Sequence, residues 1–232
     1  MTQETNKKQI FITVSLLLAV IFIFESTNLD IFFQSFFYDF KTNLWIVDER
    51  NFLLDLIFYS GFKKLFIFFA ICLLLVIILS FFKKITIIES YKKGLIIVLL
   101  STIIVPFSIV SAKYISNMPC PNDTVTFGGS YPEIKVFEYY PKEFVQESRI
   151  KCWPAGHATM GFSLMSLFFL FKRQRNKNIA LVSSLIIGFC TGAYKVLVGD
   201  HFVSHTIITM ICAWLIILLI ARIVLYKKET SI

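Results

Sequence analysis

Residues 65–82 read LFIFFAICLLLVIILSFF, a run without a single charged side chain. A helix rises about 1.5 Å per residue and the hydrocarbon core of a bilayer is about 30 Å thick, so about 20 apolar residues can span it. The rest of the chain has the same character, since 56% of its 232 residues are hydrophobic and its mean hydropathy is +0.73. Soluble domains contain about 45–50% apolar residues. The sequence therefore predicts an integral membrane protein.

Six apolar blocks along the chain are candidate membrane spans. They cover residues 10–24, 65–82, 94–112, 158–171, 178–199 and 202–226. The first block has the length of a signal peptide, but no cleavage site of small residues follows it, so we interpret it as an uncleaved anchor. No internal repeat or Gly-Ser linker divides the chain. The blocks predict an all-α bundle of six transmembrane helices that forms one domain over residues 1–232.

The basic residues predict the orientation of these spans, because loops on the cytoplasmic side of a membrane are enriched in lysine and arginine. The basic clusters lie at alternate ends of the blocks and comprise Lys7-Lys8, Lys83-Lys84, Lys92-Lys93, Lys172 to Lys177 and Lys227-Lys228. Both termini are therefore expected in the cytoplasm, with residues 25–64, 113–157 and 200–201 on the other side. Lys63-Lys64 conflicts with this rule. The net charge of +8 then reflects topology and attraction to anionic lipid, and no nucleic-acid partner is expected.

Two polar segments on the outer side have distinct expected structures. Residues 51–62, NFLLDLIFYSGF, are too few and too mixed to span, so they predict a helix lying in the interface with Trp45 and Tyr59 at headgroup level. The outer loop, residues 113–157, holds five of the six prolines and the Gly128-Gly129 turn, and irregular structure is expected there.

All three histidines and two lysines fall near the outer ends of the predicted spans. Lys113 closes the third span, His157 opens the fourth, Lys195 lies near the end of the fifth, and His201 and His205 begin the sixth. One such lysine fits a side chain that snorkels, and one such histidine fits a structural role. Five together favour a functional site, because ionisable groups are costly near hydrocarbon. No carboxylate lies in mid-membrane, which argues against a proton-coupled transporter.

Three short motifs carry these residues. The first is Lys113, YISNMP and Cys120-Pro121, the second is Pro154-Ala155-Gly156-His157, and the third is Lys195, VLVGD, His201, FVS and His205. They resemble the type 2 phosphatidic acid phosphatase superfamily, whose motifs are Lys-x6-Arg-Pro, Pro-Ser-Gly-His and Arg-x5-His-x3-Asp. The order and spacing agree over roughly residues 94–220. The chain departs from the pattern at Cys120, Ala155, Lys195 and His205, which resembles a divergent bacterial branch.

The resemblance implies a haloperoxidase-like helical core and a role for each motif residue. His201 is the expected nucleophile, forming a phosphohistidine, and His157 is the expected general acid and base. His205 would hold the far nitrogen of His201, with Asp200 as the alternative. The phosphate would be bound by charged side chains and by backbone N–H groups at the start of a helix. The expected phosphate-binding residues are Lys113, Lys195, Ala155, Gly156 and Arg149. Arg149 and Lys151 flank Cys152, and either could substitute for the missing motif arginine.

The resemblance implies no metal and no cofactor, but the His-x-x-x-His spacing leaves open a metal site formed by the three histidines. Cys120 and Cys152 both lie in the outer loop beside the first two motifs. On a periplasmic side they could form a disulfide, worth about 3–4 kcal/mol by the entropy model, and the alternative is two unrelated thiols.

These observations predict a lipid phosphatase in a bacterial inner membrane, with its site facing the periplasm. The expected partner is a lipid phosphate in the bilayer: phosphatidic acid, phosphatidylglycerophosphate, undecaprenyl diphosphate or a lipid A phosphate. Phosphotransfer to another lipid is an equally open outcome, and the oligomeric state is left open. The alternative function is a metal-binding transporter or a non-enzymatic membrane protein.

Overall fold

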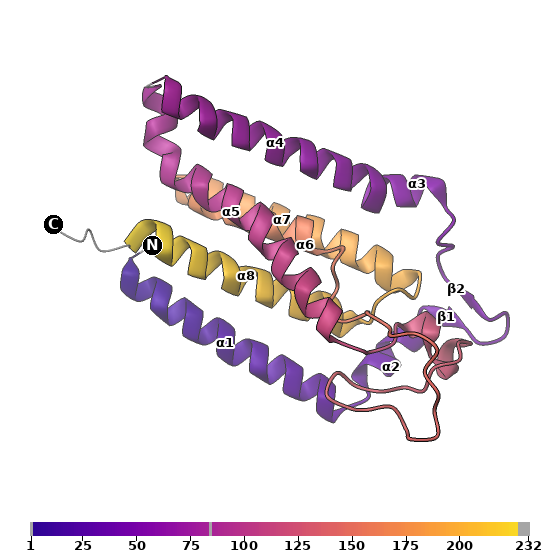
Figure 1. Cartoon of the computed structure of the whole chain (residues 1–232). Coiled ribbons are helices and arrows are strands. Elements are labelled where there is room, and N and C mark those ends of the chain that lie inside the picture. The colour runs from indigo at the N-terminus through magenta and orange to yellow at the C-terminus, as the bar shows by residue number, and fades with distance from the viewer. Residues whose placement is uncertain (1, 84, 227–232) are drawn as a thin grey trace.

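The computed structural model is an elongated bundle of helices that run roughly alongside one another (Figure 1). It describes residues 2–83 and 85–226, so Lys84, Lys227 and Lys228 of the predicted basic clusters lie outside the described residues. Five helical segments are long and apolar enough to cross a membrane. They are α1 (Gln3–Ser26), the continuous helix Phe52–Phe82, α5 (Thr86–Ile115), α7 (Gln174–Leu197) and α8 (Val203–Tyr226).

The fourth predicted span differs from the expectation. Residues 158–171 form only a short apolar helix, which consists of α6 (Thr159–Ser163) and a 3-10 segment (Leu164–Phe169). At about 1.5 Å per α-helical and about 2.0 Å per 3-10 residue, this segment is about 20 Å long and falls short of a bilayer. Its place in the middle of the bundle explains its apolar character, because Phe162 and Met165 pack in the core against Val105, Ala213 and Ile217.

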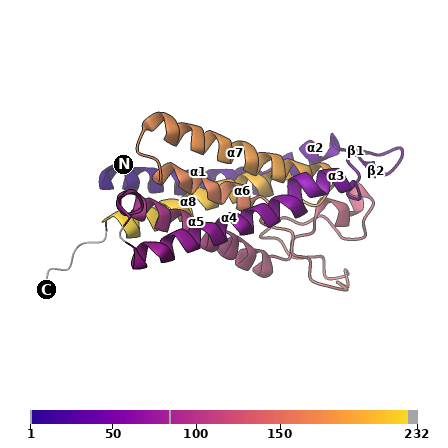
Figure 2. The same cartoon turned by 90° about the horizontal axis from the view of Figure 1, so that it is seen from above.

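Close approach of two backbones holds α6 in this central place. A Cβ atom at Gly161 would lie 2.6 Å from Gly188 Cα on α7, and one at Gly188 would lie 2.2 Å from the Phe162 ring. Both positions therefore require glycine, as is common where membrane helices pack tightly. Figure 2 shows α6 among the longer helices of the bundle, and the two glycines allow it to pack closely against α7.

The predicted interfacial helix is also wrong. Residues 52–82 form one continuous helix of 31 residues: α3 (Phe52–Asp55), a π-helical turn (Leu56–Ser60) and α4 (Gly61–Phe82). Gly61 does not end the helix. The π-helical turn contains one of the expected interfacial anchors, Tyr59, whose ring stacks on His157 with centroids 4.7 Å apart. Such turns are frequent at functional sites.

The longest segments between the helices gather at one end of the bundle (Figure 1). They are α2 (Leu29–Ser35), a small antiparallel hairpin of β1 (Tyr38–Asp39) and β2 (Leu44–Trp45), and the outer loop with its 3-10 turns Pro121–Asp123 and Val125–Phe127. The outer loop is otherwise irregular, as predicted. An aromatic cluster of Tyr38, Trp45 and Phe127 joins the hairpin to the loop.

The start of α1 lies at the opposite end of the bundle, beside the end of α8 (Figure 1). Asn6, fully buried, donates a hydrogen bond from its amide to the Leu218 carbonyl. The outer loop and the start of α1 therefore lie at opposite ends of the bundle.

Candidate active site

The three histidines lie together at the loop end of the bundle. The ring centroids of His157 and His201 are 5.6 Å apart, and those of His201 and His205 are also 5.6 Å apart. The Nδ1 atoms of His201 and His205 are separated by 3.4 Å. His201 and His205 are almost completely buried, whereas His157 is half-buried. With the Tyr59 ring in front of His157, the four rings form a row that leads from the surface into the core.

Local backbone structure explains how His201 and His205 meet. After α7, Gly199 adopts a φ of 82°, a left-handed conformation that favours glycine, and the Trp45 ring packs against it. The N–H of His201 then donates to the Lys195 carbonyl at 3.2 Å. Since α8 begins at Val203, His205 lies in its first turn, and the four-residue spacing brings its ring toward His201.

The two motif lysines have different surroundings. Lys195 is 4% exposed, and its Nζ lies 2.6 Å from Asp200 Oδ2 and 3.8 Å from Glu49 Oε1. Asp200 also accepts a hydrogen bond from Asn122 at 3.2 Å. The Asp200 carboxylate is therefore bound to Lys195 and Asn122. The side-chain atoms beside His201 Nδ1 are instead His205 Nδ1 and Cys152 Sγ, each 3.4 Å away.

Lys113 lines a cavity of about 380 Å³ between the start of α4 and the end of α5. One wall is polar and basic, and the other is apolar. The polar wall comprises Tyr59, Lys63, Lys113, Tyr114, Lys151, Gly156, His157 and Thr159, and the apolar wall comprises Pro106, Val110 and Met160. In the part of the chain that the structure describes, His157 is the histidine that reaches this cavity, and His201 lies one ring behind it.

The lysines and the burial of the site keep the imidazoles neutral. Withdrawal from water, followed by the ammonium groups of Lys195, Lys113 and Lys63, lowers the pKa of His157 to about 3. Burial, followed by the neighbouring imidazoles and lysines, also holds the pKa of His201 well below its usual range. A neutral ring is the form in which an imidazole nitrogen has a lone pair free to attack.

A comparison with protein families matches residues 94–229 to the PAP2 superfamily. The chain belongs to the PAP2 superfamily. It is also 26% identical, over 91% of its length and 93% of the relative's, to the lipid A 4'-phosphatase of Francisella tularensis subsp. novicida (strain U112). No solved structure matches the chain significantly. Family and relative together support a lipid phosphatase in a bacterial membrane.

Three predicted phosphate-binding residues of this PAP2 protein, Arg149, Ala155 and Lys195, do not line the cavity. Arg149 donates a hydrogen bond from Nη2 to the Ile115 carbonyl at the end of α5. Ala155 is fully buried, and its carbonyl accepts a hydrogen bond from Thr209 at 3.2 Å. The basic residue of this loop that lines the cavity is Lys151, whose Nζ lies 4.2 Å from the centre of the Tyr114 ring.

The sequence analysis missed Tyr59 and Lys63 as cavity residues, whereas it considered Lys151 together with Arg149. One signal was present, because Lys63 violated the distribution of positive charge expected for its side of the membrane. The positive-inside rule does not account for a lysine at this position, whereas a role in lining the cavity does.

Cys120 and Cys152 form a disulfide, with Cα atoms 5.2 Å apart, that joins the first motif to the second. Cys152 Sγ lies 3.4 Å from His201 Nδ1 and 3.1 Å from the Asp200 carbonyl oxygen. The disulfide therefore contacts the ring of the candidate nucleophile on the side away from His157.

Among the described residues, one group has the mutual spacing of metal ligands, and it consists of Cys120, Cys152 and His201, whose ligand atoms lie within 4.8 Å of one another. This group differs from the three-histidine site considered above. Both sulfur atoms are committed to the disulfide here.

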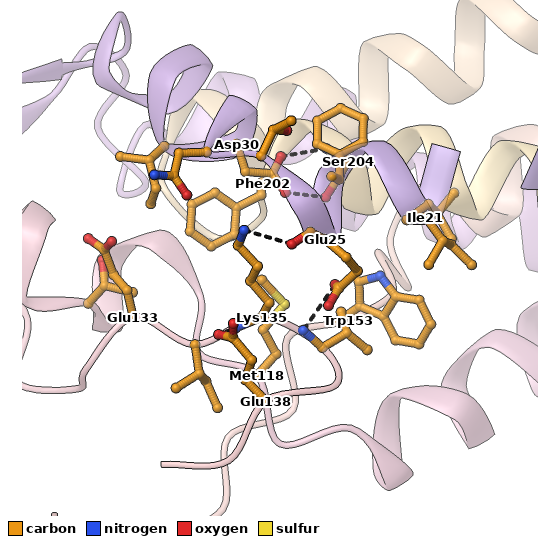
Figure 3. Close-up of a pocket in the computed structure, with 18 residues that line it drawn as sticks. Ile21, Glu25, Asp30, Met118, Glu133, Lys135, Glu138, Trp153, Phe202 and Ser204 are labelled. Atoms are coloured by element: carbon orange, nitrogen blue, oxygen red, sulfur yellow. Dashed lines mark hydrogen bonds between the residues drawn. The ribbon is translucent and has the colours of Figure 1, made fainter. Parts of the chain in front are cut away.

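A second cavity, of about 280 Å³, lies between α1, α2 and the outer loop (Figure 3). Its charged groups are largely paired: Lys135 Nζ donates to the Glu25 carbonyl at 2.7 Å, and Asp30 accepts hydrogen bonds from the backbone N–H and the hydroxyl of Ser204. Burial raises the pKa of Asp30 to about 6. Because Ser204 precedes His205, Asp30 fixes the start of α8 and with it the third motif.

Proposed function

We propose that this PAP2 protein removes a phosphate group from a membrane lipid through a phosphohistidine on His201 Nε2. The observation that carries the proposal is the row of rings, in which His157 lies at the cavity wall and His201 directly behind it. The Nδ1 atom of His201 faces His205 and the disulfide, which leaves Nε2 as the nitrogen available for attack. His205 would accept the Nδ1 proton through its own Nδ1 and so keep the Nε2 lone pair free.

The proposed reaction has two steps. In the first, His201 Nε2 attacks phosphorus, the bond from phosphorus to the lipid oxygen breaks, and His157 gives a proton to that oxygen. In the second, His157 takes a proton from water, and the oxygen of the water displaces His201 from phosphorus. A second lipid hydroxyl in place of water would give phosphotransfer.

Positive charge around the cavity supports this assignment. Phosphoryl transfer depends mainly on positioning and on neutralising the charge of the phosphoryl oxygens. Lys113, Lys63 and Lys151 line the cavity. Lys195 Nζ lies 5.0 Å from the centre of the Tyr59 ring, and a phosphate that reached it would replace Asp200 as its partner. An approaching phosphate would also raise the pKa of His157, because it offsets the ammonium charges that lower it.

The apolar wall of the cavity suggests how the lipid lies. Pro106 and Val110 on α5, with Met160 on α6, continue the cavity lining from the phosphate-binding end. An acyl chain that follows this wall would keep its headgroup beside His157. We place a lipid A-type phosphate first among the substrates, because the relative that aligns over most of the chain is a lipid A 4'-phosphatase. Phosphatidic acid, phosphatidylglycerophosphate and undecaprenyl diphosphate follow.

We further propose the inner membrane of a bacterium, with the site on the periplasmic side and both termini in the cytoplasm. The disulfide supports this orientation, because disulfides persist in oxidising compartments such as the periplasm.

The test is phosphate release from a panel of these lipids by the purified full-length protein in detergent. His201→Ala should lower kcat by about 10³-fold or more, because removal of a nucleophile removes the whole covalent route. His157→Ala should lower it strongly, whereas a metal chelator should have no effect on the wild type. Lys113→Met should weaken substrate binding, and Lys93→Met, which lies near the other end of the same helix, is the matched control. Full activity in His201→Ala would exclude the proposal.

A second measurement tests the covalent intermediate. Rapid quenching during turnover of a ³²P-labelled lipid should leave label on the protein that survives alkali and is lost in acid, as expected for a phosphorus–nitrogen bond. Activity that disappears with chelator, without labelled protein, would favour metal-dependent hydrolysis.

A further inference from the structure

The disulfide lies against the one ring that the proposed mechanism requires to keep a free lone pair. Cys152 Sγ is 3.4 Å from His201 Nδ1, and Cys120 completes a group whose three potential ligand atoms lie within 4.8 Å of one another. Cys152 and His201 are buried, and Cys120 is partly exposed, so the group is reachable from one side. Both sulfurs are bonded to each other in the structure and offer no thiolate.

We propose that reduction of the Cys120–Cys152 disulfide converts this group into a binding site for a zinc-type metal ion. Tetrahedral zinc with bonds of about 2.3 Å to sulfur and about 2.0 Å to nitrogen places a thiolate and an imidazole nitrogen about 3.6 Å apart. The observed separation of Cys152 Sγ and His201 Nδ1, 3.4 Å, is close to that value. The Cα atoms of the two cysteines, 5.2 Å apart, hold both sulfurs near the ring after reduction.

A fourth potential ligand atom, a second imidazole nitrogen, lies next to the group. His205 Nδ1 is 3.4 Å from His201 Nδ1, and two imidazole nitrogens on tetrahedral zinc are about 3.3 Å apart. The His205 Nε2 atom is buried and has no hydrogen-bond partner among the described residues. The site therefore offers two soft thiolates and one or two imidazoles, a ligand set that favours zinc over magnesium or calcium.

The reduction step balances with a water-soluble phosphine as the reductant. The phosphine gives two electrons to the sulfur–sulfur bond and takes an oxygen atom from water, and each sulfur takes one proton from that water. When Zn²⁺ binds, both thiol protons are released to solvent, because thiolates are the ligands.

Metal binding on this side of the ring would stop catalysis. A neutral imidazole has one lone pair and one N–H, so a metal on Nδ1 leaves the proton on Nε2. Nε2 then has no lone pair for phosphorus. This inhibition rests on the proposed function of His201, whereas binding of the metal does not. The intact disulfide thus prevents a metal ion from binding to His201.

The test compares oxidised and phosphine-reduced full-length protein, freed of reductant under nitrogen and titrated with Co²⁺. The reduced protein should bind a single ion and show thiolate-to-cobalt charge-transfer absorption, which Zn²⁺ then abolishes by displacement. The oxidised protein keeps the free thiols of Cys72, Cys190 and Cys212, so it controls for binding elsewhere. Equal spectra from the two forms, or no charge-transfer band after reduction, would overturn the proposal.

Two variants identify the ligand set. Reduced His201→Ala should lose the high-affinity band, and reduced His157→Ala, which removes a ring outside the ligand group, should keep it. Cys120→Ala should lose the band, and if this variant does not fold, the comparison of the two wild-type forms decides alone. Retention of the band in folded His201→Ala would exclude Nδ1 as a ligand.

Activity separates this inference from the proposed function. One equivalent of Zn²⁺ should lower phosphatase activity of the reduced protein by about tenfold or more and leave the oxidised protein nearly unchanged, with recovery on chelation. A protein that binds Co²⁺ only when reduced but releases no phosphate in either form would retain the metal site and refute the phosphatase assignment. A protein that is an active phosphatase but does not bind Co²⁺ when reduced would retain the phosphatase assignment and refute the metal site.

Discussion

Gly156 allows a direct test of where the phosphate binds, because a methyl group can be added there without disturbing the fold. A Cβ atom at this position would lie 3.9 Å from Val110 Cγ2 and 4.0 Å from Lys113 Cδ, which are ordinary contacts. The φ of Gly156 lies outside the left-handed region, so alanine is also free of backbone strain. Gly156→Ala should therefore leave the free energy of unfolding unchanged or raise it by about 0.4–1 kcal/mol. The thermal unfolding temperature should stay the same or rise slightly.

The same methyl group should impair catalysis. It would project beside Lys113 into the cavity, where the phosphate is proposed to approach the backbone of residues 155–157. Loss of one well-placed donor costs about 10²–10³-fold in kcat in other enzymes, and a shifted phosphate should cost less. We expect a loss of about 10–100-fold in kcat/KM, which corresponds to about 1.4–2.7 kcal/mol.

The assay is steady-state phosphate release in mixed micelles, with thermal unfolding measured on the same preparations. Gly161→Ala is the comparison, because its Cβ would lie 2.6 Å from the α7 backbone and should lower the unfolding temperature. An unchanged kcat/KM in a fully stable Gly156→Ala protein would refute the proposed phosphate position. A loss of stability in the same variant would refute the packing argument.

Two further perturbations test the charges around the site. The pKa of Asp30, raised from 3.8 to about 6, means that folding favours its protonated form, so its contribution to stability is present below pH 3.8 and is lost as pH rises through about 6. The control is Asp30→Asn, which can still form a hydrogen bond with Ser204. Relative to this variant, the free energy of unfolding of the wild type should fall by up to about 3 kcal/mol between pH 4 and pH 7, as measured by thermal unfolding. Parallel pH profiles of the two proteins would contradict this. Asp200→Asn removes the 2.6 Å partner of the buried Lys195, so the variant should unfold at lower temperature, and added inorganic phosphate should stabilise it more than it stabilises the wild type. A smaller phosphate-induced shift in the variant would show that Asp200 assists phosphate binding.

The long apolar segments could be predicted from the sequence because hydropathy alone defines them. The blocks at residues 10–24, 94–112 and 202–226 correspond to helices of at least 24 residues. The block at residues 158–171 is also apolar, but Phe162 and Met165 in it are buried against other parts of the protein, whereas a spanning helix also meets lipid. Composition reports that a segment avoids water and does not distinguish these two surroundings.

The error at residues 51–62 has a different cause. Asp55 and Gly61 interrupt the apolar pattern, so the segment resembles a separate amphipathic piece. In the structure the helix continues through both residues by forming a π-helical turn. That turn directs Tyr59 at His157, a partner almost 100 residues away in the chain, and no local pattern contains that information.

The candidate site was predictable where motif spacing and helix geometry agree. His201 and His205 are four residues apart, with His205 in the first turn of α8 and His201 two residues before that helix begins, and the sequence shows this spacing without tertiary knowledge. Arg149 and Lys151 were not separable, because both flank the same cysteine in an irregular loop. The course of the loop decides between them, and it turns Arg149 toward the end of α5 and Lys151 toward the cavity.

The departures from the family motifs make physical sense together. A histidine in place of aspartate at residue 205 removes a negative charge next to His201, and a disulfide occupies the place of the first-motif arginine. The space beside the nucleophile thus contains neutral groups, and the charged pair of Lys195 and Asp200 lies to one side. A phosphate that enters must take Lys195 from Asp200, so a doubly charged phosphate competes better than a singly charged one. The Lys195–Asp200 pair is therefore balanced in charge until a phosphate replaces the Asp200 carboxylate, whereas the cavity that His157 lines is already basic, because Lys63, Lys113 and Lys151 also line it.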